Sequence, residues 1–177
     1  MKKSLKLLFL IFLNIIIIGL FLPTQYHIEK SIKINAKPSD IHYWVNDLAH
    51  WKTWSPWEII DPSIKMKLGN KTKGVGANQS WFGKSGKGEL TFIQVNQTGV
   101  HYNMIFNDEH LATSSISYQK NKKSTLVTWE LSGSNHALIT AGYEVLFIKY
   151  IFSSSLELGL ENLKSQTEMN LKNKSDT

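Results

Sequence analysis

The side chains that are able to carry metal or nucleophilic chemistry are scattered along this 177-residue chain rather than grouped. The six histidines never recur at His-x-His or His-x-x-x-His spacing, and the chain has no cysteine. A metal site would need ligands from distant segments, so we expect neither a metal nor a cofactor. The sequence also lacks a Gly-x-Ser-x-Gly elbow, a phosphate loop followed by a helix and a dinucleotide fingerprint.

Two titratable residues, Glu130 and His101, are candidates for a general acid or base held in an apolar cavity. Glu130 follows Trp129, and His101 precedes Tyr102, in segments that alternate like β-strands. Successive strand residues point to opposite faces. If the aromatic residues face inward, both titratable residues face solvent, so we predict no catalytic residue and do not expect an enzyme.

Tryptophan is clustered: four of the six tryptophans fall within fourteen residues, at Trp44, Trp51, Trp54 and Trp57. Tryptophan is large and rigid, and it is costly to leave in water. The cluster therefore either plugs one end of a hydrophobic core or lines a pocket for an apolar ligand. Trp44 fits a plain core position. The other three tryptophans lie on a loop with Pro56, and for them both alternatives stay open.

The elements that must position these residues follow from periodicity. Alternation predicts a strand from Tyr26 to Ile34, and Pro38 with the polar residues after it predicts a helix start. Short β-like segments separated by turn residues then predict a meander of antiparallel hairpins. These segments are residues 64–68, 77–82, 89–95, 99–106, 112–119 and 125–132.

The last segment changes period. From Ile151 or earlier to Met169, apolar residues recur every three or four positions, which predicts a long amphipathic helix. Its inward face is predicted to carry Phe152, Leu156, Leu160 and Leu163. A curved antiparallel sheet with this helix across its concave face is an α+β arrangement that leaves an apolar cavity between the two.

The N-terminus predicts a membrane helix. The apolar run from Leu7 to Leu22 spans about 24 Å as a helix, between the usual length of a signal-peptide core and that of a full membrane span. No small residues stand at the positions that signal peptidase requires, so we expect an uncleaved anchor. The lysines before the run place the N-terminus inside. The remaining domain then faces the outer side of the cytoplasmic membrane, and a single-pass anchor holds it there.

Charge limits the classes of partner. The formal net charge is +6, but all 20 basic residues are lysine and none is arginine. Bidentate recognition of phosphate or guanine by arginine is therefore absent, and we expect no nucleic acid partner.

We expect a monomer with three parts: residues 1–24 as the anchor, 25–169 as one domain and 170–177 as a polar, frayed tail.

Several motifs, in order, resemble the bacterial polyketide cyclase/dehydrase group of the START-like, or SRPBCC, superfamily. They are Ile32-Lys-Ile34-Asn-Ala36-Lys-Pro38, Trp51-x-x-Trp54-Ser-Pro-Trp57, Gly74-Val-Gly-Ala77 with Trp81, Leu126-Val-Thr-Trp129 and Gly159-Leu-Glu-Asn-Leu-Lys164. The resemblance covers Tyr26 to about Glu168. It implies a helix-grip fold, in which a curved antiparallel sheet grips a long C-terminal helix around a hydrophobic cavity.

Our prediction is therefore a membrane-anchored binding module for a hydrophobic small molecule or lipid. The alternatives are a cyclase or dehydrase that uses the same cavity, and an accessory domain whose cavity has collapsed. Tyr118 or Asn103 is expected to orient the ligand. The predicted cavity wall, with Trp54 or Trp57 at its mouth, consists of Trp54, Trp57, Trp81, Phe92, Met104, Phe106, Trp129, Leu131, Phe152 and Leu156.

Overall fold

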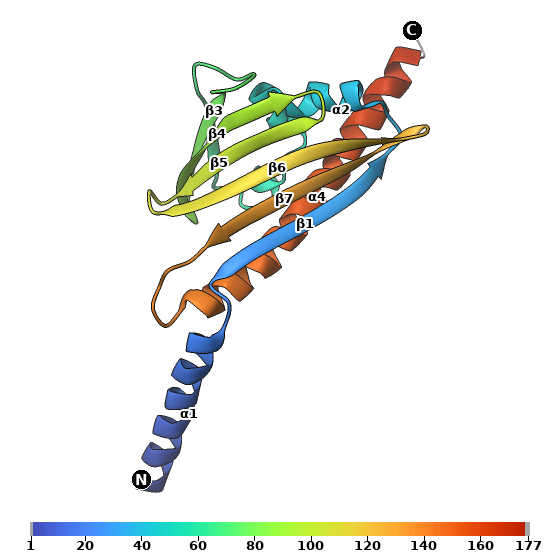
Figure 1. Ribbon diagram of the computed structural model, residues 1–177. Coiled ribbons are helices and arrows are strands. Elements are labelled where there is room, and N and C mark those ends of the chain that lie inside the picture. Colours follow the sequence, from blue (N-terminus) through green and yellow to red (C-terminus); the bar gives the residue numbers. More distant parts are fainter. Residues whose placement is uncertain (1, 176–177) are drawn as a thin grey trace.

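The computed structural model describes residues 2–175. Seven strands form one antiparallel sheet in the order β1-β7-β6-β5-β4-β3-β2 (Figure 1). The meander is as predicted, and β1 extends it by pairing with the last strand. The elements in chain order are α1 (Lys2–Phe21), β1 (Gln25–Ile34), α2 (Pro38–Val45), the 3₁₀ helix η1 (Leu48–Thr53), α3 (Trp57–Ile60), β2 (Lys65–Leu68), β3 (Asn78–Gly83), β4 (Gly86–Asn96), β5 (Gly99–Phe106), β6 (His110–Asn121), β7 (Ser124–Ser134) and α4 (Ala141–Ser175).

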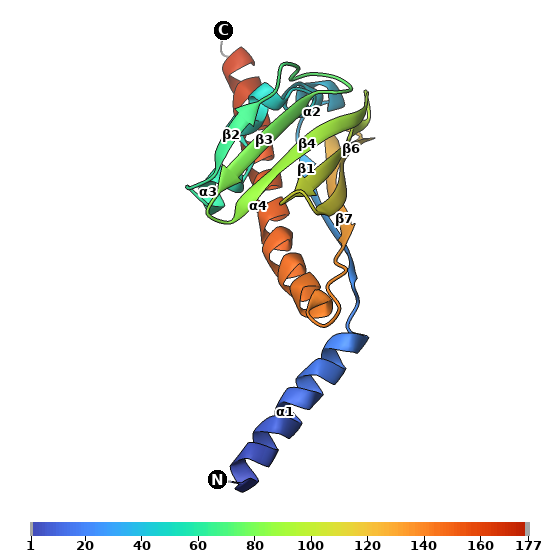
Figure 2. The same ribbon diagram turned by 90° about the vertical axis from the view of Figure 1, so that its left-hand side faces the viewer.

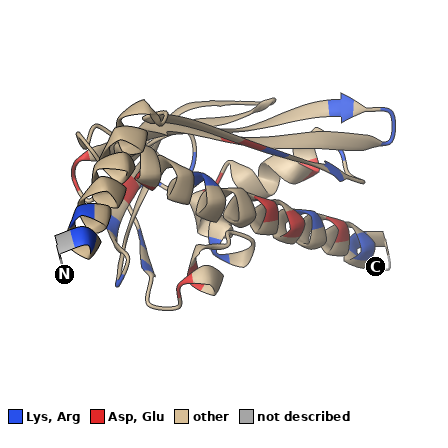
Figure 3. Cartoon of the chain, turned by 90° about the horizontal axis from the view of Figure 1, so that it is seen from below, with Lys and Arg blue, Asp and Glu red and all other residues tan. Residues whose placement is uncertain are grey.

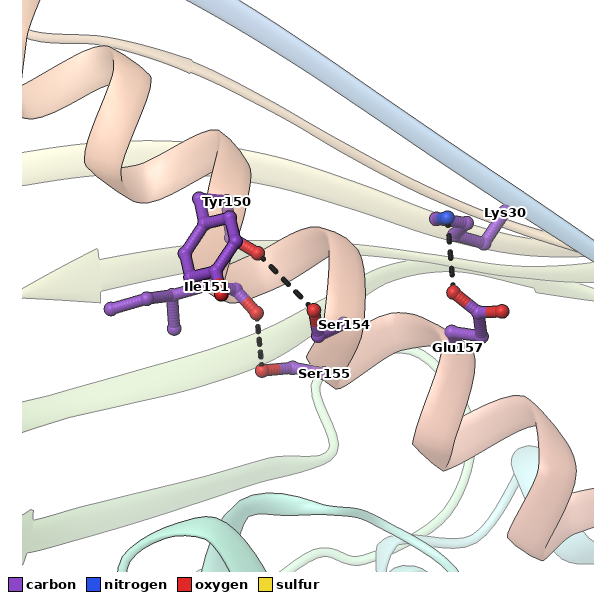
Figure 4. Close-up of polar contacts among 6 residues, drawn as sticks. All are labelled: Lys30, Tyr150, Ile151, Ser154, Ser155 and Glu157. Atoms are coloured by element: carbon purple, nitrogen blue, oxygen red, sulfur yellow. Dashed lines mark hydrogen bonds and ion pairs between the residues drawn. The ribbon is translucent and has the colours of Figure 1, made fainter.

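Helix α4 lies across the concave face of the curved sheet (Figures 1 and 2). Leu156, Leu160 and Leu163 are no more than 1% exposed, whereas Glu157 and Glu161 are exposed, as the spacing predicts. At the sheet edge Lys30 Nζ donates to Glu157 Oε2 over 3.1 Å (Figure 4). The apolar face of α4 and the sheet therefore form the core, and an ion pair links the polar side of the helix to β1.

The middle of α4 carries three consecutive serines. Ser154 and Ser155 donate to the carbonyl oxygens of Tyr150 and Ile151, one turn earlier in the helix (Figure 4). Ser155 is 2% exposed, so this bond inside the helix satisfies a hydroxyl that water does not reach.

Helix α4 is longer than the predicted helix at its C-terminal end, and this corrects one expectation. Residues 170–175, predicted to be a frayed tail, are helical, because Thr167 is buried and Leu171 packs against the core. Residues 176–177 lie outside the described part of the chain. At the other end α4 begins at Ala141. Leu146, Phe147 and Tyr150 are exposed there, so no amphipathic period marks this part of the helix in the sequence.

Helix α1 is long and apolar enough to cross a membrane by its length and composition. It extends away from the sheet (Figures 1 and 2), and its side chains are almost all exposed. A membrane anchor and a signal sequence both meet this description.

Candidate functional site

An apolar pocket lies between α3, strands β2 to β5 and α4. Its volume is about 50 Å³, which is room for a few water molecules and well below the ~300–1,000 Å³ of a site for a drug-sized ligand. The residues that line it are Trp57, Ile64, Met66, Gln79, Trp81, Leu90, Met104, Phe106 and Phe152.

Strand register builds the floor of the pocket. Gln79 pairs with Leu90, and Leu90 pairs with Met104, so these side chains form a row across β3, β4 and β5. Trp81 and Phe106 follow on the same face, since each lies two residues further along its strand. Their ring centroids are 5.3 Å apart. The inward alternation predicted for Met104 and Phe106 is what places them here.

Two helices cover this floor. The ring of Trp57 on α3 lies 5.6 Å from that of Phe152 on α4, and Phe152 lies 6.0 Å from Phe106. All three rings are partly exposed. Ile64, Met66 and Trp81 are partly exposed as well, so the pocket approaches solvent both beside these rings and along the β2 edge.

Gln79 supplies the single polar side chain of the lining. It is 4% exposed, and its side-chain amide makes no hydrogen bond to any of residues 2–175. The amide faces the space of the pocket: among the described residues, the buried side-chain atom without a hydrogen-bond partner is Asn46 Oδ1, not an atom of Gln79. Water in the pocket, or a hydrogen-bonding group on a ligand, is therefore able to reach this amide.

Trp51 and Trp54 have a different role from Trp57. Their indole nitrogens donate to the carbonyl oxygens of Val45 (2.9 Å) and Trp44 (3.0 Å), at the C-terminal end of α2. The last carbonyls of a helix lack partners within the helix, and these two indoles satisfy them. Both rings are no more than 1% exposed. Both alternatives for the cluster therefore occur: Trp51 and Trp54 plug the core, and Trp57 lines the pocket.

Trp129 is also a core residue. Its indole nitrogen donates to Tyr102 Oη (2.9 Å) and to Ser114 Oγ (3.1 Å). Burial raises the pKa of Tyr102 well above its usual value, so this hydroxyl stays neutral. The three side chains form a hydrogen-bonded network in the core, and the ring of Trp129 also packs edge-on against that of Trp57 in the pocket lining, with centroids 6.2 Å apart.

Of the ten residues predicted for the cavity wall, the structure brings five to the pocket: Trp57, Trp81, Met104, Phe106 and Phe152. The other five lie in the closed core, where they contact neighbouring side chains instead of an open space. This second group is Trp54, Phe92, Trp129, Leu131 and Leu156.

Sequence reasoning missed Ile64, Met66, Gln79 and Leu90. Gln79 lies two residues before Trp81 on the same strand, so alternation indicates that both share a face. The expected orienting residues are elsewhere: Asn103 is exposed on the outer face, and Tyr118 is buried beside His42.

The two acid–base candidates do not reach the pocket. His101 is exposed, and Glu130 is half-buried on the outer face of the sheet. None of the nine lining residues is titratable. Among the described residues, no group of three or more His, Cys, Asp or Glu side chains is placed to hold a metal ion.

Asp61 shapes the rim of the pocket. Its carboxylate accepts hydrogen bonds from Ser63 Oγ (2.6 Å), Ser63 N (2.9 Å) and Ser85 Oγ (2.7 Å). These bonds, those from Ser63 first, lower the pKa of Asp61 to about 2. They link the loop before Ile64 to the β3–β4 turn, so the loop and the hairpin are held together at the pocket edge.

Solved structures share this arrangement over most of the chain. TTHA0849 from Thermus thermophilus is 12% identical, with a TM-score of 0.60 over 82% of this chain and 99% of its own. Ara h 8.0201 is 8% identical, with a TM-score of 0.59 over 82% of this chain and 99% of its own. The chain has the START-like helix-grip fold.

The helix-grip domain is also similar to the di-domain ARO/CYC StfQ from the steffimycin biosynthetic pathway. The identity is 8% and the TM-score 0.65, over 84% of this chain and 52% of StfQ. Identities this low carry the fold and not the activity. No protein-family model and no curated protein matches the sequence.

Proposed function

We propose that this protein is a membrane-anchored binding module for an apolar small molecule or lipid. The observation that carries the proposal is the composition of the pocket: eight apolar or aromatic side chains around one unpartnered amide, that of Gln79. A pocket of this kind binds an apolar body by burial and orients it through a single polar group.

The amide of Gln79 indicates which polar group the ligand carries. It is neutral, and no lining residue supplies a charge. A carboxylate or ammonium would be buried without a counter-charge, which costs several kcal/mol. A hydroxyl or carbonyl on a hydrocarbon chain or ring meets no such penalty, so the ligand is an alcohol, ester, ketone or similar neutral lipid.

The volume of about 50 Å³ accommodates only one end of such a ligand unless the pocket opens. Its outer wall includes Met66 on β2, a four-residue edge strand that pairs only with β3. A short edge strand separates from the sheet more readily than a central strand, and methionine side chains adapt to irregular volumes. Entry between β2 and α3 therefore requires the least rearrangement of the core.

Helix α1 gives the module its location. We infer that it stays attached as an uncleaved anchor, because no pair of small residues precedes a cleavage point near Pro23. The lysines before Leu7 keep the N-terminus in the cytoplasm, so the helix-grip domain lies on the outer side of the membrane. In this proposal the domain acts as a monomer and without nucleic acid.

The small volume also favours a second candidate, an accessory domain whose cavity stays closed. The two candidates differ in whether an apolar probe binds saturably to the pocket. A cyclase-type enzyme has less support, because no titratable side chain lines the pocket.

A fluorescence titration tests the proposal. The chain from residue 25 onward is titrated with N-phenylnaphthylamine, and bound dye is displaced by a long-chain alcohol or by the matching alkane. We expect saturable binding and displacement by the alcohol at about a fivefold lower concentration, for a hydrogen bond of about 1 kcal/mol. The Gln79→Leu variant should lose this preference. Absence of saturable binding would instead support the closed accessory domain.

A further inference from the structure

The first turns of α4 and the loop before them expose large apolar side chains to solvent. Leu138 is 89% exposed, Phe147 65% and Tyr150 77%, and Ile139 and Leu146 are also exposed. We refer to these five residues as the α4 base. In Figure 3 most of the charged residues of α4 lie toward its C-terminal end, whereas its first ten residues carry only Glu144 and Lys149.

Helix α1 packs directly against the start of α4. Tyr143 Oη donates to the carbonyl oxygen of Ile15 over 2.7 Å. Gly19 leaves room for the tyrosine ring, since a Cβ atom there would lie 2.8 Å from Tyr143 Cε2. A Cβ atom at Gly142 would lie 2.2 Å from Leu22 Cβ. The two helices therefore meet in a close contact and not only through the connecting chain.

This contact between α1 and α4 determines how deep the α4 base lies relative to the membrane. Ile15 precedes the last residue of α1, Phe21, by six residues, which is about 9 Å along a helix at about 1.5 Å per residue. When α1 spans a bilayer, Ile15 lies inside the hydrocarbon. The side chain of Tyr143 must then reach the same depth, and the α4 base must lie at the membrane surface.

Helix α1 as a whole is long enough to cross a membrane, but its uncharged run is shorter than the helix, and this leads to the same conclusion. The run from Leu7 to Leu22 spans about 24 Å, some 6 Å short of the ~30 Å hydrocarbon core. A short span favours sinking of flanking apolar groups into the bilayer. The α4 base supplies such groups at the outer end of α1.

We propose that the α4 base is a second membrane contact, with Phe147 and Tyr150 in the boundary between the headgroups and the acyl chains of the outer leaflet. Aromatic side chains favour this region, and apolar helix faces insert into it. The contact rests on the proposed anchoring by α1. It orients the helix-grip domain, because α1 and α4 then enter the same leaflet as one packed pair.

Because the chain has no cysteine, single cysteines labelled with the fluorophore NBD test this proposal directly. Four full-length variants are placed in vesicles of phosphatidylethanolamine and phosphatidylglycerol that contain doxyl-labelled phospholipid. The variants are Phe147→Cys and Tyr150→Cys in the α4 base, Ile17→Cys in α1 as the reference for lipid, and Ser165→Cys on the exposed side of α4 as the reference for water.

We expect the labels at positions 147 and 150 to emit at shorter wavelength than the label at 165, and the doxyl lipid to quench them. Labels as aqueous as that at 165, while the label at 17 is in lipid, would overturn the second contact and leave the anchor intact. An aqueous label at 17 would overturn both. A blue-shifted label at 147 without quenching by lipid would indicate contact with a second protein chain, which also overturns the proposal.

Discussion

Gly159 of α4 lies directly against the indole of Trp129 of β7. A Cβ atom at Gly159 would lie 2.5 Å from Cζ3 of Trp129 and 3.0 Å from Cδ of Pro56. The helix is therefore able to approach the sheet, and the tryptophan motifs at residues 51–57 and 129 meet the Gly159 motif at this point. Asn162, one turn further, donates to the carbonyl oxygen of Trp54 over 3.2 Å.

Replacing Gly159 with alanine should destabilise the fold. The added methyl group meets a buried aromatic ring, and overpacking of this kind costs about 1–3 kcal/mol, against a gain of about 1 kcal/mol in helix propensity. Urea unfolding should show a net loss on the order of 1 kcal/mol. Ser165→Ala, on the exposed side of the same helix, is the control and should be neutral or stabilising. An unchanged midpoint for Gly159→Ala would contradict this packing.

The inward face of α4 gives a second prediction. Leu160→Ala should lower the free energy of unfolding by about 2–5 kcal/mol, because it opens a cavity in the core. Glu161→Ala is the matched neighbour on the exposed side and should cost little, since it removes an exposed side chain. Denaturant titrations of both variants would decide the point, and equal midpoints would mean that the helix faces are wrongly assigned.

The general architecture follows from the sequence because it depends on periodicity. Alternation over residues 26–34 and 99–106 identifies strands, and the spacing of Leu156, Leu160 and Leu163 identifies the inward face of α4. Both patterns reflect local backbone geometry, which each segment adopts independently of the segments that pack against it. The two ends of α4 are harder to predict from the sequence, because its first turns are apolar on several sides and its last turns are mostly polar.

The pocket was only partly predictable, for a physical reason. Alternation shows that Trp129 and Met104 both face inward, but not that Trp51, Trp54 and Gly159 close the space around Trp129 while the space beside Met104 stays open. That difference depends on how α3 and η1 pack on the sheet, which no local pattern encodes. The position of Gln79, a polar residue on an inward face, was the available signal.

The third prediction concerns which face of β5 and β7 binds the ligand. Met104→Ala enlarges the pocket, so it should change the affinity for N-phenylnaphthylamine. Glu130→Ala and His101→Ala alter the outer face and should leave the affinity nearly unchanged. Equal affinity in wild type and Met104→Ala, together with loss of binding in Glu130→Ala, would place the site on the outer face and restore an acid–base mechanism as a candidate.

His42 provides a pH-dependent test. Burial, and then the charge of Lys73, lower the pKa of His42 in the folded protein, whereas an unfolded histidine titrates near pH ~6.5. The unfolded chain therefore binds the proton more tightly, and the free energy of unfolding should fall as the pH drops below about 6.5. His42→Gln should reduce this dependence, as measured by urea unfolding at several pH values. The same slope in wild type and variant would assign the effect to another group.

The most direct test of the central claim is photo-crosslinking, because it reports where an apolar ligand resides without any mutation. The full-length protein in vesicles is illuminated with a long-chain alcohol that carries a diazirine near the end of its chain, and labelled residues are mapped by mass spectrometry. Some labelling of α1 by alcohol dissolved in the bilayer is expected. The account predicts additional labels at Met66, Met104 and Phe152, which excess unlabelled alcohol removes. Labels restricted to α1 and to exposed residues of the domain would contradict it.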